Sequence, residues 1–262
     1  MKELSKTKRK ILSGLDRFKE RLKKKEFRAC GYKVVLEIAA EFKIKWLVFG
    51  KEFFRNHTER VNDLLKLLGK KSAFKSNVEN NVFLSGDAEV EKYGVCGVFM
   101  LPDYIFEESS RALEILKMWK RVVFLNGVQD PANVGGIMRV ASAFGFDGVV
   151  ADFNSADFFS PKVLRAAGGF IPEVMRVRRL EELLNGFKGQ VYILDVEAIK
   201  EIEDVAFEEK FGVVLGSEGR GIILDKELLR VDFVSVKIPV KVESLNVYSA
   251  FSIFSYVSSL EG

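Results

Sequence analysis

Two residue types on which many catalytic and metal sites depend are scarce in this chain of 262 residues. It has two cysteines, Cys30 and Cys96, and one histidine, His57. Two cysteines are too few for a disulfide framework or a zinc site. His57 lies in a polar stretch that is typical of a protein surface. We therefore expect no metal site and no catalytic triad built on histidine.

Long hydrophobic runs are absent too, since the longest is far short of the roughly 20 residues that a membrane helix needs. No apolar core follows the first lysines, so we expect no secretory signal. A dinucleotide-type G-x-G-x-x-G after a strand and a G-x-x-x-x-G-K-[ST] phosphate loop are also missing. These absences favour a cytoplasmic protein that has no membrane partner. They argue against a Rossmann-type dinucleotide fold and against nucleotidase chemistry.

Positive charge is concentrated at one end of the chain. Residues 1–28 hold twelve Lys or Arg against four Asp or Glu, a balance of +8, whereas the whole chain is +4. Apolar residues recur there at helical spacing from Leu4 to Leu22, which predicts a basic amphipathic helix. Such a segment suggests a polyanionic partner, and the alternative is a solvated surface helix.

Three parts of the chain are distinguished by their patterns: the basic segment 1–28, residues 29–115 and residues 116–262. In the second part, alternating helix-like and strand-like stretches predict a small α/β domain with a mostly parallel sheet. Pro102 to Lys120 is predicted to be a linker in which Ser109 and Ser110 cap a short helix. After residue 121 we expect a second α/β sheet with a final helix over residues 245–260 and these strands: 122–125, 148–151, 174–177, 191–194, 211–215 and 233–238.

Polar and glycine-rich stretches directly follow three of the predicted strands of the last part. The first runs from Asp130 to Arg139, the second from Gly216 to Gly221, and the third from Ile238 to Asn246. Loops after parallel strands meet at one edge of a sheet, where α/β folds bind their ligands. Asn133 offers an amide and Arg139 a fork of donors that suits phosphate, so the pattern favours a phosphate-containing ligand.

These three stretches, in this order, resemble the three signature motifs of the SpoU family. Its members are S-adenosylmethionine-dependent RNA ribose 2′-O-methyltransferases of the knotted SPOUT class. The resemblance covers roughly residues 120–262, and it includes Ser160-Pro161-Lys162 with Arg165-Ala166. It implies a trefoil-knotted parallel-sheet methyltransferase domain, a homodimer, and ribosomal or transfer RNA as substrate. The position of the preceding small α/β domain resembles the RNA-binding module of many SpoU enzymes.

The resemblance also implies roles for individual residues. We expect the catalytic residues to be Arg139, Asn133, Glu218 and Asn246. We expect the cofactor-binding residues to be Gly216, Ile238, Pro239, Ser244 and Leu245. A guanidinium stays protonated in proteins and is therefore a poor base, so we expect Arg139 to orient and polarise the 2′-hydroxyl.

Several assignments stay open at this stage. Asn133 could instead cap a helix, Glu218 could only order its loop or act through Arg139, and Ser244 could only cap the last helix. The stretch from Val240 to Glu243 is shorter than usual for the family, and Ala167 stands where the family often has serine. The alternatives to the enzyme are a non-catalytic RNA-binding or ribosome assembly factor with a SPOUT fold, and a SPOUT enzyme that modifies a base.

Overall fold

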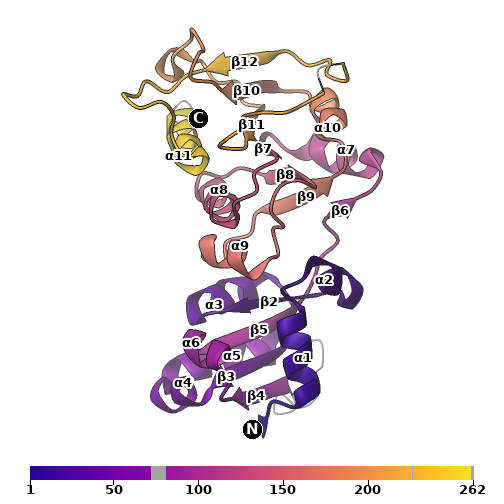
Figure 1. Cartoon of the computed structure of the whole chain (residues 1–262), viewed down its shortest axis with the longest axis vertical. Helices are drawn as coiled ribbons and strands as arrows, with labels where there is room; N and C mark the ends of the chain where they lie inside the picture. The colour runs from indigo at the N-terminus through magenta and orange to yellow at the C-terminus, as the bar shows by residue number, and fades with distance from the viewer. Residues whose placement is uncertain (72–80, 226, 261–262) are drawn as a thin grey trace. The chain divides into compact units, whose positions relative to one another are not determined.

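A computed structural model describes residues 1–71, 81–225 and 227–260. The chain divides into two compact units, whose elements are labelled in Figure 1. The N-terminal unit comprises Met1–Asp103 and Phe159–Phe170, and the C-terminal unit comprises Tyr104–Phe158 and Ile171–Gly262. The division therefore falls between Asp103 and Tyr104, earlier than the boundary expected near residue 115.

The N-terminal unit contains a five-stranded sheet in the order β1-β4-β3-β5-β2. Its elements are β1 Lys2–Glu3, α1 Lys6–Gly14, α2 Phe18–Lys24, β2 Glu26–Cys30, α3 Tyr32–Glu41, β3 Ile44–Gly50, α4 Lys51–Asn56, α5 Thr58–Lys71, β4 Val82–Ser85, α6 Ala88–Tyr93, β5 Val95–Met100 and α9 Pro161–Ala166. The α/β character was predicted, but the mostly parallel sheet is wrong. Strand β5 runs antiparallel to both β3 and β2, and the chain enters it directly from α6 through Gly94, whose φ of 77° ends that helix.

The basic segment forms two helices, α1 and α2, where the sequence predicted one. It is also part of the core, since Leu4, Leu12 and Leu15 are buried in the N-terminal unit. The helix breaks where the Arg21 side chain donates to the carbonyl oxygens of Leu15 and Asp16, both at 2.8 Å. Residues 1–28 therefore cannot be removed without exposing the apolar core of this unit.

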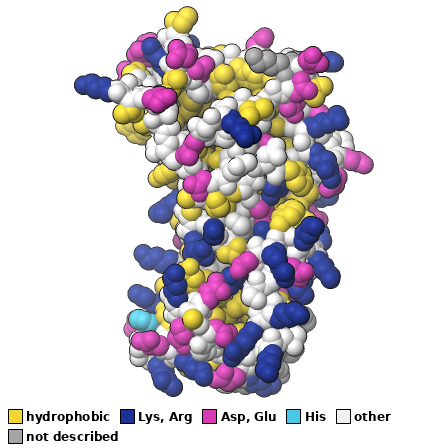
Figure 2. Space-filling view, in the orientation of Figure 1, with side chains coloured by type: hydrophobic (Ala, Val, Ile, Leu, Met, Phe, Trp, Pro, Cys, Tyr) yellow, Lys and Arg dark blue, Asp and Glu magenta, His cyan; other side chains and the backbone are white. Residues whose placement is uncertain are grey.

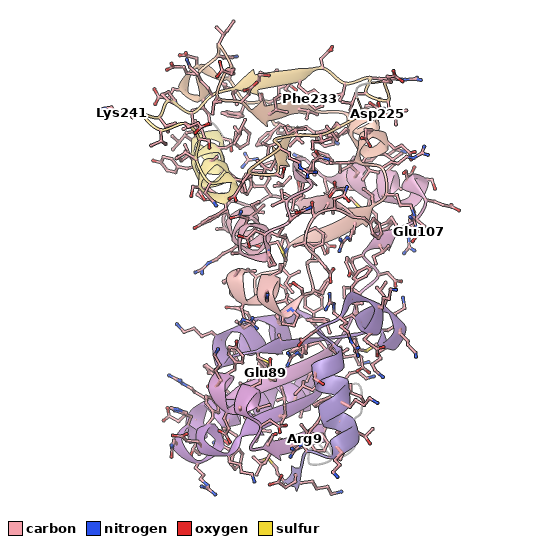
Figure 3. All side chains as sticks on the ribbon, in the orientation of Figure 1. Arg9, Glu89, Glu107, Asp225, Phe233 and Lys241 are labelled. Carbon is pink, nitrogen blue, oxygen red and sulfur yellow. A yellow bond between two sulfur atoms is a disulfide. The ribbon has the colours of Figure 1, made fainter. Side chains whose placement is uncertain are left out.

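Two further contacts fix the basic segment and the end of the strand that follows it. The buried Arg28 donates to Asp16 at 2.7 and 2.8 Å and to Glu89 at 2.7 Å, and Figure 3 labels Glu89 on α6. Cys30 and Cys96 lie directly opposite each other on β2 and β5, and they form a disulfide that the cysteine count did not predict. The basic segment is thus an integral part of a cross-linked unit.

The C-terminal unit is built on a seven-stranded sheet in the order β12-β10-β11-β7-β8-β9-β6, with every pairing parallel. Its elements are β6 Ile105–Phe106, α7 Ser109–Met118, β7 Arg121–Asn126, α8 Pro131–Ala143, β8 Gly148–Asp152, β9 Glu173–Val177, α10 Leu180–Gly186, β10 Gln190–Leu194, a 3-10 turn Ile202–Asp204, β11 Phe211–Gly216, β12 Phe233–Val236 and α11 Val247–Ser259. All six strands predicted after residue 121 are present. Most are apolar runs that the parallel sheet buries, whereas β12, at the edge of the sheet, is only half-buried.

The linker predicted over residues 102–120 is wrong, although the short helix expected within it is present as α7. It contains β6, which pairs with β9, and α7, which packs in the core of the C-terminal unit. The reason is its apolar content, since Phe106, Ala112 and Leu116 are buried. Ser109 does not cap α7 either, because Glu108 holds the cap position and the Ser109 hydroxyl bonds to Glu182 instead.

The chain order reverses between β7 and β11. Strands β8 and β9 follow β7 on one side, whereas β11, β10 and β12 lie on the other. Ligands of open α/β sheets bind beyond the carboxyl ends of the strands at such a reversal. The loops that leave β7 at Asn126 and β11 at Gly216 are therefore the natural place for a site. Across the part of the chain that the structure describes, no helix is both long and apolar enough to cross a membrane.

Candidate active site

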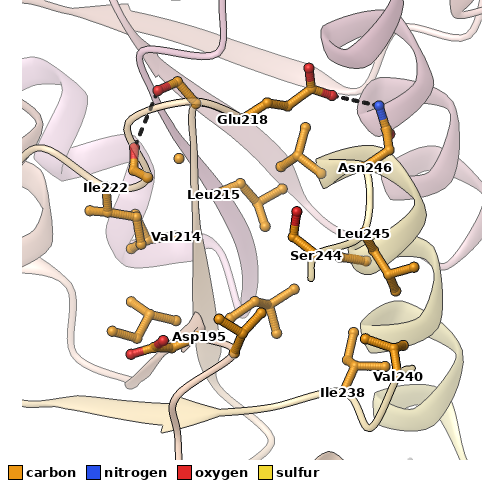
Figure 4. A pocket seen from close by; sticks show the side chains of 18 residues that line it. Asp195, Val214, Leu215, Glu218, Ile222, Ile238, Val240, Ser244, Leu245 and Asn246 are labelled. Atoms are coloured by element: carbon orange, nitrogen blue, oxygen red, sulfur yellow. Dashed lines mark hydrogen bonds between the residues drawn. The ribbon is translucent and has the colours of Figure 1, made fainter. Parts of the chain in front are cut away.

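Three polar side chains, one from each predicted motif, meet at this edge of the sheet. Asn133 Nδ2 donates to Glu218 Oε1 at 2.7 Å, and Asn246 Nδ2 donates to the same oxygen at 2.6 Å. Asn246 Nδ2 also lies 2.9 Å from Asn133 Oδ1. We call Asn133, Glu218 and Asn246 the polar cluster, and Figure 4 draws its bond between Glu218 and Asn246. Residues 113 positions apart in the chain are thereby joined.

The local structure holds each member of the cluster in place. Asn133 lies in the first turn of α8 and is buried, with 5% of its surface exposed. Asn246 is the N-cap of α11, since its Oδ1 accepts from Tyr248 N at 3.0 Å and Ser249 N at 3.4 Å. Glu218 is carried on the turn after β11, where Ser217 and Gly221 pair. Asn133 therefore has its orientation fixed by two partners and Asn246 by four.

Two caps differ from the sequence-based expectation. Asp130, not Asn133, caps α8, because its Oδ1 accepts from Ala132 N at 2.8 Å and Pro131 occupies the first turn. Asn246, not Ser244, caps α11. Both asparagine side chains contact Glu218, whose two open roles were to order its loop or to act through Arg139.

Arg139 lies apart from the cluster within this chain. Its side chain is exposed on α8, and it makes no hydrogen bond or ion pair with any residue that the structure describes. It follows Asn133 by six positions, which turns it roughly 120° around the helix. Arg139 is therefore presented to solvent, away from the face that carries Asn133.

A cavity of about 670 Å³ adjoins the polar cluster (Figure 4). It is lined by four of the five residues predicted to bind the cofactor, Gly216, Ile238, Ser244 and Leu245; Pro239 is not among its lining residues. Glu218 and Asn246 also line it, so the cluster forms part of its wall.

Sequence reasoning missed the contribution of β10 to this cavity. Ile193, Leu194, Asp195 and Val196 line it at the carboxyl end of that strand. Asp195 Oδ1 accepts from Glu197 N at 3.0 Å, which fixes the carboxylate at the cavity wall. A polar residue directly after an apolar strand was the signal that could have identified Asp195, as it did the three motifs.

The space beside Gly216 is filled by the turn that follows it. A Cβ at this position would lie 2.3 Å from the carbonyl carbon of Gly221 and 2.6 Å from Ile222 N. The glycine therefore lets residues 217–221 fold back against β11. This turn forms one wall of the cavity and carries Glu218. Among the described residues, no three His, Cys, Asp or Glu side chains come together as a possible metal site.

Comparisons with known proteins agree with this geometry. The SpoU rRNA Methylase family matches residues 120–256. The 23S rRNA (guanosine(2553)-2′-O)-methyltransferase RlmP of Bacillus subtilis is 33% identical over 149 residues, which cover 55% of this chain and 59% of RlmP.

Solved structures match over nearly the whole chain. A structure from Porphyromonas gingivalis, assigned to RNA methyltransferases of the TrmH family, is 27% identical with a TM-score of 0.71 and 97% of each chain covered. The rRNA methyltransferase of Sinorhizobium meliloti, solved with AdoMet bound, has a TM-score of 0.75 at 22% identity and shares the fold over 98% of this chain and 96% of that one. The match over more than half of its length confirms the resemblance, and the chain belongs to the SpoU rRNA methylase family of RNA methyltransferases.

Proposed function

We propose that this protein transfers a methyl group from S-adenosylmethionine to a ribose 2′-hydroxyl of ribosomal or transfer RNA. The observation that carries the proposal is the polar cluster, which joins all three motifs at the wall of a cavity large enough for the cofactor. RlmP, to which this chain is similar, is named as a methyltransferase of the 2′-oxygen of a guanosine in 23S rRNA.

The cavity fits the cofactor in size and in chemistry. Its volume lies within the roughly 300–1,000 Å³ of typical ligand pockets. Leu215, Ile238 and Leu245 offer an apolar surface for an adenine ring, and Asp195 offers a carboxylate to sugar hydroxyls. Bound there, S-adenosylmethionine supplies a methyl group on a sulfonium, which is already an activated leaving group.

The chain's own residues would then position the acceptor. Glu218 Oε1 accepts two amide N–H groups, which fix the orientation of the carboxylate, while Glu218 Oε2 has no hydrogen bond with the described residues. That oxygen is available to accept a hydrogen bond from the 2′-hydroxyl and so to orient it. Arg139, an always charged fork of donors, suits the adjacent phosphate.

Since Arg139 is exposed and unpaired within the described chain, we propose that it serves the site of a second subunit in a homodimer. The family resemblance implies such shared sites. Exposed apolar residues on α11, among them Ile253 and Tyr256, offer a contact surface near Tyr248, which packs on Gly136 of α8. We also propose that α11 is threaded through the preceding loop as the trefoil knot of the family.

Incubating the protein with methyl-labelled cofactor and unmodified ribosomal or transfer RNA tests the proposal. Label should enter the RNA, and the rate of incorporation should fall when S-adenosylhomocysteine is added as a competitor for the cofactor site. A protein that binds these RNAs tightly but incorporates no label would be an assembly factor instead.

Cofactor binding should need no metal, because the cavity wall supplies apolar side chains, backbone and carboxylates that suit the cofactor directly. We expect the same dissociation constant for S-adenosylmethionine in calorimetric titrations with and without a chelator. Loss of binding in the chelator would show that a metal ion helps to form the cavity.

The protein should be a dimer at micromolar concentration, because an exposed Arg139 completes a site only across an interface. Light scattering should give twice the chain mass, and Tyr256→Asp, which places a charge on the exposed face of α11, should shift the mass toward one chain. A wild-type monomer would contradict the shared site.

The basic face of the N-terminal unit should provide affinity for RNA. Figure 2 shows Lys and Arg side chains gathered over α1 and α2. Lys6, Lys10, Lys19 and Lys23 are exposed there and form no ion pair with the described residues. Lys8 is different, because it lies over the rings of Trp46 and Phe83, where burial lowers its pKa.

Replacing the four exposed lysines by glutamine should weaken RNA binding and leave folding intact, since glutamine keeps a similar helix propensity. Each lost phosphate contact should reduce the slope of log affinity against log salt by about 0.7–0.9. Filter binding at several salt concentrations measures the slope, and cofactor affinity serves as the control. An unchanged slope would make this face a solvated surface.

A further inference from the structure

A second cavity, of about 590 Å³, lies within the C-terminal unit beyond the carboxyl ends of β7 and β8. Its lining includes Asn133 and Glu218 of the polar cluster. Ser217 and Glu218 line both this cavity and the cofactor cavity. A molecule held in the second cavity therefore meets Asn133 and Glu218 of the polar cluster, and it lies next to the cofactor cavity.

The floor of the second cavity is rigid and already hydrogen-bonded. Asn126 Oδ1 accepts from Ile223 N at 2.5 Å. Asp152 accepts from Gly127 N at 3.0 Å and from the hydroxyl of Ser155 at 2.7 Å. Both side chains are buried, with 7% and 6% of their surfaces exposed. The polar groups of the floor are thus already hydrogen-bonded within the protein, and these bonds hold the shape of the cavity.

The rim of the cavity is different, because its polar side chains are exposed and largely unengaged. Gln129, Asn154 and Arg220 make no side-chain hydrogen bond or ion pair with any residue that the structure describes. Asp130 uses Oδ1 to cap α8, and its Oδ2 has no partner among those residues. The rim therefore offers two amides, a carboxylate and a guanidinium to a ligand.

We propose that this second cavity holds the target nucleotide, extruded from the RNA, and that the Asp130 carboxylate reads its base as guanine. The inference rests on the proposed function, whose acceptor it identifies. Single-stranded RNA is recognised by splaying a base out and hydrogen-bonding its edges. The size of the cavity suits one nucleotide, with the sugar at the polar cluster and the base at the rim.

The choice of base follows from the chemistry of the rim. A carboxylate only accepts hydrogen bonds, and its two oxygens lie side by side. Guanine alone among the four bases places two N–H donors, N1 and N2, next to each other on its Watson–Crick edge. Arg220, at the same rim, suits a flanking phosphate, a contact that carries affinity for any sequence.

Asp130→Asn isolates the proposed contact. Asparagine caps a helix as well as aspartate does, so α8 should keep its start and the variant should fold. The amide, however, replaces one acceptor with a donor that faces a guanine N–H. We expect the variant to keep its cofactor affinity and to lose about ten- to a hundredfold of its activity on RNA.

Methylation is tested with total ribosomal and transfer RNA, which is digested afterwards to nucleosides. The wild type should yield 2′-O-methylguanosine far above the other three 2′-O-methylnucleosides. Arg220→Gln is the matched rim variant, and it should lower the rate without changing which nucleoside is methylated. A product that is mainly 2′-O-methyluridine, -cytidine or -adenosine, or an Asp130→Asn variant with the normal rate, would overturn the proposal.

A second experiment measures binding and does not depend on turnover. NMR titration of the full-length protein, saturated with S-adenosylhomocysteine, compares guanosine and inosine monophosphates, which differ only in the N2 amine. The wild type should prefer guanosine monophosphate with shifts at the rim, and Asp130→Asn should bind both alike. Equal binding by the wild type would overturn the pocket assignment. If no RNA is methylated but guanosine monophosphate is preferred, the proposed function is wrong, whereas the assignment of the second cavity as a guanine-binding pocket is supported.

Discussion

Replacing Arg139 by alanine should abolish methyl transfer while leaving the fold and the cofactor affinity unchanged. The side chain is exposed and makes no hydrogen bond or ion pair with any residue that the structure describes, so its removal breaks none of these bonds. Loss of one preorganised charge contact at a reacting centre commonly costs about 100-fold or more in rate. Single-turnover rates with saturating cofactor measure this effect, and circular dichroism monitors the fold.

Arg139→Lys should recover little activity, because an ammonium lacks the planar fork that matches a phosphate. Near-normal turnover of Arg139→Ala would remove this residue from the active site. If the alanine variant unfolded or lost its cofactor, Arg139 would instead be a structural residue.

Mixing two inactive variants tests whether Arg139 serves its own subunit or its partner. Half of the dimers in an equal mixture of Arg139→Ala and Glu218→Ala chains combine both types. If Arg139 acts across the interface, each mixed dimer keeps one intact site, and about a quarter of the wild-type activity returns. If it acts within its own subunit, the mixture stays inactive.

Gly216→Ala should prevent cofactor binding. Its new methyl group would meet the backbone of Gly221 and Ile222 at 2.3–2.6 Å, and backbone cannot step aside as a flexible side chain can. The turn over residues 217–221 must then move away from β11, which deforms the cavity wall and displaces Glu218. Calorimetry should show at least about a tenfold weaker cofactor affinity, and overpacking should lower the free energy of unfolding by about 1–3 kcal/mol.

Gly219→Ala is the matched control, because it lies in the same turn and a Cβ there would meet nothing within 4 Å. It should leave both cofactor affinity and stability close to the wild type. Similar losses in the two variants would mean that the turn tolerates no side chain anywhere, and the close approach at Gly216 would not be the cause.

The strands of the C-terminal unit could be predicted from sequence because a parallel sheet buries both faces of its strands. Runs such as Val122–Leu125 and Phe211–Leu215 are therefore apolar throughout and stand out from their surroundings. The positions of the three motifs were readable because each follows a predicted strand, and their identity came from the resemblance to the SpoU family.

Features that depend on tertiary packing were not readable. The Arg21 side chain donates hydrogen bonds to the carbonyl oxygens of Leu15 and Asp16 just after α1, and no local sequence pattern predicts that the helix ends there. Residues 102–120 looked like a linker because their charges outnumber the few apolar residues that α7 buries. Asn246 rather than Ser244 caps α11 because Asn133 and Glu218 hold it there, a fact that requires three distant segments to be seen together.

The chemical form of the product tests the central claim most directly. A 2′-O-methyl group removes the hydroxyl that alkali needs to cleave the adjacent phosphodiester, so labelled RNA can be hydrolysed in alkali and its fragments identified by mass. We predict that the label resides in alkali-resistant dinucleotides with the methyl group on the ribose. Label in mononucleotides with a methylated base, or no label despite bound cofactor and RNA, would contradict the account.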